Sequence, residues 1–206
     1  MTTTLSTTTP GDFSGLTPDQ VLNALESIGL HSDGRLLALN SYENRVYQIG
    51  IEAGSPLVAK FYRPARWSDA AILEEHAFVQ ELVEREIPVV PAQVIDGKTL
   101  HEFAGFRFSV FAKHGGRAPE LDDRATLEWM GRFLGRIHAI GALKPFDHRP
   151  TLDIDSFGIA PRDFLFSHDF IPADIEPAYR SVIDQALQGV RQCFERAGKV
   201  NHIRLH

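Results

Sequence analysis

The alternation of apolar and polar residues predicts strands in the first half of the chain. Residues 35–52 and 55–64 are rich in β-branched and aromatic residues and meet at the turn-forming sequence Ala-Gly-Ser-Pro. Residues 92–116 contain further strand-like runs, which turn at Asp96-Gly97 and near Gly105. This pattern predicts a hairpin or meander followed by more strands, and therefore a mostly antiparallel sheet.

Apolar residues at helical spacing predict one helix before these strands, one among them and two after them. In the first helix, Thr17 can cap the N-terminus and Pro18 suits the first turn, while Gly29 can end the helix. The last helix is also followed by a glycine, Gly198. The predicted helices cover residues 18–28, 69–85, 121–141 and 176–197.

This order of elements predicts an α+β fold with two lobes. A strand-rich lobe with one inserted helix is expected over residues 16–113, and a helical lobe over residues 114–206, with the link near residues 113–116. The Thr-rich residues 1–15 have neither an apolar core nor a basic cluster. They predict a flexible tail, not a signal peptide.

The composition is that of a globular protein, with 43% hydrophobic and 23% charged residues among 206. A formal net charge of −6 without Lys or Arg blocks argues against nucleic acid as a partner. No run approaches the roughly 18 apolar residues of a membrane span, and no His or Cys cluster has metal-ligand spacing. The single cysteine, Cys193, rules out an internal disulfide. We expect a cytoplasmic monomer that binds neither nucleic acid nor membranes.

Two charged residues stand at apolar positions and predict each other as partners. Lys60 lies inside the apolar strand Leu-Val-Ala-Lys-Phe, where an ammonium needs an anion or a path to solvent. On the next helix, Glu75 projects into the middle of an apolar stripe, whereas Glu74 falls toward the polar side. One internal ion pair satisfies both residues, and the alternative is a lysine that extends to solvent at a strand edge. The stripe comprises Ile72, Phe78, Val79, Leu82 and Val83.

A strand lysine paired with a carboxylate from the next helix is the arrangement by which kinases hold the α- and β-phosphates of ATP. The candidate loop over the phosphates is residues 40–45, which contain no G-x-G-x-x-G motif. There, Ser41 and Asn44 offer polar donors instead, and an ordinary hairpin turn is the alternative. Adenine would lie at the lobe junction against the backbone of residues 110–113, a stretch that also suits a core strand.

Six segments in chain order carry a family resemblance: LNSYENRVYQI, VAKFYRPARW, ILEEHAFVQELV, PVVPAQV, GGRAPE and GRFLGRIHAIG. Together they resemble the stress response kinase A family of bacterial Ser/Thr protein kinases, whose fold is of the aminoglycoside-phosphotransferase and choline-kinase type. The resemblance runs from about residue 16 to the end, and SYENRVYQ with KFYRP is its most specific combination. It implies a bilobal protein-kinase-like fold, ATP and Mg²⁺ as cofactors, and a protein Ser or Thr hydroxyl as substrate. The implied ATP-site residues are Ser41, Asn44, Lys60, Glu75, Val110, Phe111 and Lys113.

The resemblance also implies where the catalytic residues should lie. The family's His-Gly-Asp-x-His-x-x-Asn motif, which supplies the base and a metal ligand, is expected just after His206, so we expect no catalytic residue and no metal ligand within this chain. Residues 200–206 have the strand-like composition expected before that motif. Asp153 and Asp155 are interpreted as loop residues, because Asp is common in turns.

Two further functions are compatible with these residues. A small-molecule kinase of the aminoglycoside, choline or homoserine type would share the same N-terminal lobe. A non-catalytic protein would bind a nucleotide or a partner without doing chemistry, and the 206-residue chain alone is expected to be inactive.

Overall fold

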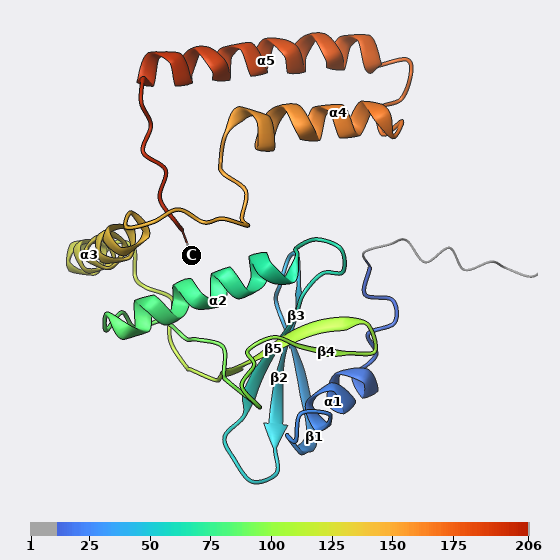
Figure 1. Ribbon diagram of the computed structural model, residues 1–206, viewed down its shortest axis with the longest axis vertical. Coiled ribbons are helices and arrows are strands. Elements are labelled where there is room, and N and C mark those ends of the chain that lie inside the picture. Colours follow the sequence, from blue (N-terminus) through green and yellow to red (C-terminus); the bar gives the residue numbers. More distant parts are fainter. Residues whose placement is uncertain (1–11, 206) are drawn as a thin grey trace, which may run out of the picture. The chain divides into compact units, whose positions relative to one another are not determined.

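The computed structural model describes residues 12–205 and has the predicted α+β composition (Figure 1). Residues 1–11, which make up most of the predicted tail, and His206 lie outside the described residues. One five-stranded antiparallel sheet has the strand order β1-β2-β3-β5-β4. The strands are β1 (Ser32–Leu39), β2 (Arg45–Ile51), β3 (Leu57–Phe61), β4 (His101–Phe103) and β5 (Phe106–Ala112).

Helix α1 (Pro18–Glu26) packs against one face of this sheet. The Thr17 hydroxyl accepts a hydrogen bond from the Gln20 amide at 3.3 Å, which confirms the predicted cap. Just before α1, Phe13 stacks on Phe106 with ring centroids 6.3 Å apart, so this part of the predicted tail is packed on the sheet. The core on this face consists of Leu16, Val21, Ala24, Leu25, Ile49, Ala59, Phe61, Phe108 and Val110.

Helix α2 (Asp69–Glu84) contacts β3 through side chains on the face of the sheet opposite α1, such as Lys60. Its N-terminus is capped by Ser68, whose Oγ accepts from the Ala71 amide at 3.2 Å. Because side chains alternate along a strand, the neighbours of the core residues Ala59 and Phe61 point away from the α1 core, toward α2. The buried residues of α2 are Ala71, Ile72, His76, Phe78, Val79 and Leu82, which confirms most of the predicted stripe.

The chain divides into two compact units, and the first extends to Ile140. Helix α3 (Arg124–Gly141) begins three residues later than predicted, where Asp123 Oδ2 accepts from the Thr126 amide at 2.8 Å. Within this unit, the guanidinium of Arg136 donates to the carbonyls of Arg85 and Glu86 at the C-terminus of α2. The lobe boundary predicted near residues 113–116 lies in the connection between β5 and α3 and stays a prediction.

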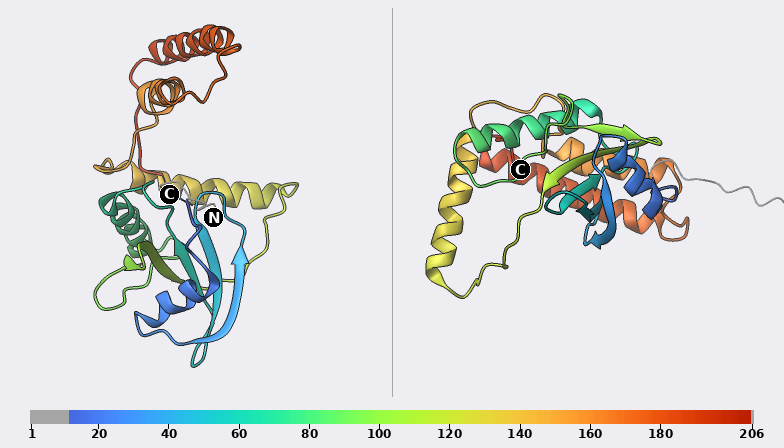
Figure 2. Two further views of the ribbon diagram at one scale, coloured as in Figure 1. Left: turned by 90° about the vertical axis from the view of Figure 1, so that its right-hand side faces the viewer. Right: turned by 90° about the horizontal axis from the view of Figure 1, so that it is seen from below.

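The second compact unit, Gly141–Arg204, contains a pair of helices, of which the sequence predicted the second and missed the first. Helix α5 (Glu176–Ala197) has the predicted bounds, and α4 (Ala160–Ser167) lies beside it in both Figure 1 and Figure 2. A π-helix, Asp155–Ile159, leads directly into α4. The loop interpretation of Asp155 is therefore wrong. The sequence did not reveal this helical stretch because it follows a Pro-rich connection, Asp is common in turns, and Gly158 disfavours a helix.

Residues 200–205 form no strand, which corrects the strand expected there. Instead, the amide of Arg204 donates to the carbonyl of Gly141 at 3.1 Å, and Arg204 is buried. A Cβ at Gly141 would overlap the carbonyl oxygen of Arg204, so this close approach requires glycine. Residues 200–205 are thus held by this close backbone contact and not by the hydrogen bonds of a β-sheet.

Large apolar side chains are exposed along the helices of the second unit. Among its described residues, Leu187 is the one large apolar side chain that is buried. The exposed apolar residues of α4, α5 and the segments before them include Leu152, Phe157, Phe164, Phe170, Val182 and Phe194.

Over residues 12–205, no helix combines the length and apolar character that crossing a membrane requires.

Candidate functional site

Lys60 and Glu75 form the ion pair that the sequence predicts. Nζ of Lys60 in β3 lies 3.3 Å from Oε1 of Glu75 in α2. The side chains are 24% and 21% exposed, so the pair lies at the border of the core, and Lys60 does not extend alone into solvent. An ammonium has three donors. Lys60 can therefore bind an anion from outside while Glu75 neutralises it and holds it in place.

A buried histidine lies beside this pair and joins three segments. His76 Nε2 is 2.8 Å from the Tyr62 hydroxyl, and its Nδ1 is 2.9 Å from Oγ1 of Thr99. The Lys60 ammonium lies 4.9 Å from the centroid of the Tyr62 ring, a cation–π distance. The sequence analysis missed His76, although its position four residues after Ile72 places it on the buried stripe.

Burial sets the protonation state of this histidine. It lowers the pKa of His76 from 6.5 to about 4, while the nearby Glu75 carboxylate raises it and the Lys60 ammonium lowers it further. A neutral imidazole has one donor and one acceptor nitrogen, and hydroxyls can serve either role. Neutral His76 therefore satisfies both of its hydroxyl partners.

Acidification from about pH 6.5 to pH 4 is expected to destabilise the fold through His76. The folded pKa lies below the unfolded one, so as the pH falls the unfolded chain binds the proton first and stability is lost. A shift from 6.5 to about 4 corresponds to roughly 3 kcal/mol in the free energy of unfolding. Urea unfolding at a series of pH values measures this loss.

The matched variant for this experiment is His76→Gln, which cannot titrate. Its stability should fall less steeply than that of the wild type over the same pH range. Burial and then the Lys98 charge also lower the pKa of His101, but that residue titrates in both proteins and cancels from the comparison. Parallel curves for the two proteins would contradict the assignment to His76.

The loop between β1 and β2 holds its predicted phosphate-contacting residues in internal hydrogen bonds. The Ser41 hydroxyl donates to the carbonyl of Asn44 at 2.6 Å. Asn44 Oδ1 accepts from the amide of Arg63 at 3.2 Å, and Glu43 accepts from Trp67 Nε1 at 2.7 Å. The loop is therefore tied to the segment after β3, near Lys60 in sequence, and its shape is fixed without glycine.

The predicted adenine contacts divide between the two faces of the sheet. The Val110 side chain is buried in the α1 core, on the face opposite Lys60, and its carbonyl accepts from the Gln93 amide at 2.8 Å. Phe111 is half-buried and pairs with Val58 of β3. Val58 is two residues before Lys60, so the side chains of Val58, Lys60 and Phe111 lie on the same face of the sheet. Lys113 is exposed just beyond β5. Phe111 is therefore the member of this set whose side chain shares the face of Lys60.

Ser109 is a second polar residue on this face that the sequence analysis missed. It lies directly opposite Lys60 in the β3–β5 register and is fully buried. Its hydroxyl has no hydrogen-bond partner among residues 12–205. A serine in the sequence Phe-Ser-Val carries no signal of its own, and only the strand register shows which face it occupies.

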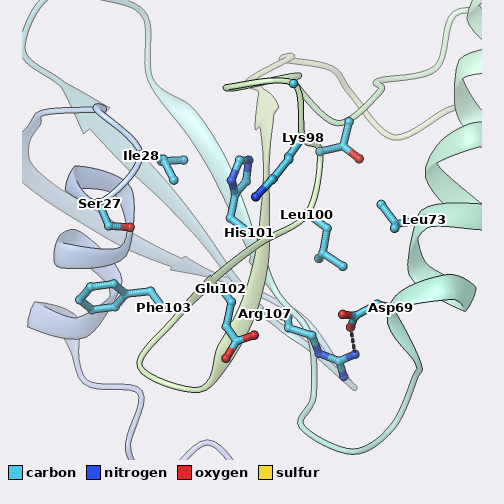
Figure 3. Close-up of a pocket in the computed structure, with 12 residues that line it drawn as sticks. Ser27, Ile28, Asp69, Leu73, Lys98, Leu100, His101, Glu102, Phe103 and Arg107 are labelled. Carbon is cyan, nitrogen blue, oxygen red and sulfur yellow. Dashed lines mark hydrogen bonds and ion pairs between the residues drawn. The ribbon is translucent and has the colours of Figure 1, made fainter.

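A cavity of about 750 Å³ lies elsewhere on this unit, between the end of α1, the segment before β4 and the first turns of α2 (Figure 3). Arg107 and Asp69 form an ion pair of 2.6 Å on its wall. Its lining includes Lys98, His101 and Glu102, but none of the predicted ATP-site residues. The cavity therefore contains neither Lys60 nor Glu75, although Thr99 on its wall is bonded to His76 beside that pair.

Comparison with known proteins places this geometry in a family. The model of the phosphotransferase enzyme family matches residues 35–193, which include most of β1, all of β2 to β5 and the Lys60–Glu75 pair. The chain belongs to the phosphotransferase enzyme family. This membership, together with the relatives that follow, confirms the resemblance found in the sequence.

Curated relatives of this phosphotransferase-family chain carry kinase names. Stress response kinase A of Shigella flexneri and of Escherichia coli K12 are each 41% identical over 178 residues, covering 86% of this chain and 54% of theirs. The serine/threonine protein kinase RdoA of Salmonella typhimurium is 38% identical over 182 residues, covering 88% of this chain and 56% of its own. The chain thus spans about half the length of these relatives.

A solved structure confirms the kinase-like fold of this family member. Amicoumacin kinase hAmiN, described in complex with AMP-PNP, Ca²⁺ and Ami, superposes with a TM-score of 0.62. The superposition covers 84% of this chain and 54% of that chain at 22% sequence identity. This likeness shows a shared fold.

Proposed function

We propose that this chain is the nucleotide-binding part of an ATP-dependent Ser/Thr protein kinase. The observation that carries the proposal is the Lys60–Glu75 pair, 3.3 Å apart at the border of the core. A cation held this way can bind phosphate oxygens and needs no reorganisation when the nucleotide arrives. The kinase names of the relatives support the reaction class, and the name of RdoA supports a protein substrate.

In this proposal, each predicted residue has a role that its surroundings permit. Lys60 contacts the α- and β-phosphates, and Glu75 neutralises and orients it. Ser41 and Asn44 maintain the loop that would cover the phosphates, because their side chains hold its backbone and the Arg63 amide. The remaining three positions flank the adenine. Phe111 contributes its side chain and Lys113 its backbone, whereas Val110, whose carbonyl is already bonded to the Gln93 amide, supports this stretch from the core.

We assign no catalytic base and no Mg²⁺ ligand to residues 12–205. Within that range no three His, Cys, Asp or Glu side chains lie close enough together to hold a metal ion. A divalent cation bound with ATP would supply charge neutralisation at the phosphates. We further propose that the protein is a cytoplasmic monomer. The single free cysteine supports the cytoplasmic location, and size-exclusion chromatography would test the monomeric state.

The substrate class is tested by a transfer experiment with labelled ATP and Mg²⁺. The whole kinase that contains this chain is offered Ser/Thr peptides, whole protein substrates, and a panel of aminoglycosides, choline and homoserine. A protein kinase should label the peptides or proteins, and Lys60→Ala should abolish that label. Transfer to the small molecules alone would instead establish the small-molecule kinase, which the same N-terminal fold permits.

A further inference from the structure

We propose that His76 is a positioning residue for nucleotide binding. It holds α2 and the Tyr62 ring in the positions in which Lys60 and Glu75 meet. The proposal rests on the function proposed for that pair, but its geometric part concerns the protein without nucleotide and can be tested separately. Its basis is the hydrogen-bonded chain from Thr99 through His76 to Tyr62.

Two contacts join α2 to β3 and to the residue just beyond the end of β3. Lys60 lies in β3 and Tyr62 follows Phe61, the last residue of that strand, while their partners Glu75 and His76 are adjacent on the helix. Adjacent helical residues differ by about 100° in direction and about 1.5 Å in height. A rotation or slide of α2 that breaks the Tyr62–His76 bond therefore also moves Glu75 away from Lys60.

The Tyr62 ring gives His76 a second route to Lys60. The ring is buried, and its hydroxyl is held at 2.8 Å by His76 Nε2. The Lys60 ammonium lies over the face of this ring, 4.9 Å from its centroid. A ring fixed by its hydroxyl therefore supports the ammonium from one side, while Glu75 attracts it from another.

Thr99 anchors the histidine to a third segment. It lies in the connection before β4, 23 residues from His76, and its Oγ1 is 2.9 Å from Nδ1. His76 is 8% exposed, so water cannot readily replace either hydroxyl partner. Loss of the Thr99 hydroxyl should therefore loosen the position of α2, because this hydrogen bond ties His76 to the connection before β4.

The first test measures the exposure of the Lys60 amine without nucleotide. The full chain is treated with limiting acetic anhydride, and peptide mass spectrometry gives the acylation rate of Lys60 relative to Lys98. Tyr62→Phe and Thr99→Val should each raise this ratio roughly two- to tenfold, the range expected for one hydrogen bond. Tyr47→Phe, which removes a tyrosine hydroxyl from the α1 face of the sheet, should leave it unchanged, as should Thr99→Ser.

The second test is a double-mutant cycle on Mg-ATP affinity. Tyr62→Phe should weaken binding roughly two- to tenfold in the wild type but less than about twofold when Glu75 is already Gln. Such non-additivity is the signature of action through the ion pair. A merely structural role would give the same change in both backgrounds and would leave the labelling ratio at its wild-type value.

The outcomes separate the two proposals. Unchanged Lys60 labelling in Tyr62→Phe and Thr99→Val, with additive effects in the cycle, would overturn the positioning role of His76. Raised labelling together with full Mg-ATP affinity in Lys60→Ala would instead refute the nucleotide role of Lys60 and leave the geometric role of His76 supported.

Discussion

Replacing Lys60 by Ala is expected to weaken the binding of Mg-ATP by at least about tenfold. A hydrogen bond to a charged group contributes about 1.5–3 kcal/mol, which corresponds to roughly 10- to 150-fold in the dissociation constant. Lys60 is held in place by Glu75 at 3.3 Å, so little of this free energy is spent on ordering its side chain. Isothermal titration calorimetry of the 206-residue chain measures the effect.

The matched control is Lys98→Ala, which removes a lysine from the same unit at an exposed position on the wall of the cavity in Figure 3. It should bind Mg-ATP like the wild type, because Lys98 lies outside the predicted ATP site. Glu75→Gln should weaken binding less than Lys60→Ala, since the ammonium remains but loses its fixed position. Wild-type affinity in Lys60→Ala would rule out the proposed contact.

Truncation of Leu82 to Ala is expected to cost about 2–5 kcal/mol in the free energy of unfolding. Leu82 is fully buried on the stripe by which α2 packs on the sheet, so the substitution leaves a cavity there. Since domains are stable by only about 5–15 kcal/mol, this change removes a large share of the total. Chemical denaturation followed by circular dichroism gives the value.

Leu73→Ala provides the comparison on the same helix. Leu73 is 44% exposed, so the same chemical change should cost well under half as much as Leu82→Ala. Equal losses for the two variants would mean that the buried face of α2 has been assigned incorrectly. The position of Glu75 within the apolar stripe of α2 would then not explain why it points toward β3.

Local periodicity was sufficient to predict the ion pair and most of the elements. Lys60 was found because it interrupts an apolar strand, and Glu75 because it interrupts an apolar helical stripe, and the structure confirms their contact. Caps and glycines gave the bounds of α1 and α5 to within about two residues. These signals depend on neighbours along the chain, which a sequence displays directly.

Features that depend on tertiary register could not be predicted in this way. The His76 contacts join residues 14 and 23 positions away, and a polar residue at a buried position does not name its partner. The face occupied by Val110 depends on the pairing of β5 with β3, and a shift of one residue would exchange it with Phe111. The helical turns before α4 were missed because they follow a Pro-rich connection and contain Asp155 and Gly158, whose local preferences are for turns and not for helix.

The phosphate contact of Lys60 is tested most directly by comparing adenosine, Mg-ADP and Mg-ATP as ligands of the wild type and Lys60→Ala. The ratio of mutant to wild-type dissociation constants should be close to one for adenosine, which has no phosphate. For Mg-ADP and Mg-ATP it should reach at least about ten, the loss of one charge-assisted contact. A ratio that is the same for all three ligands would show that Lys60 does not bind the phosphates.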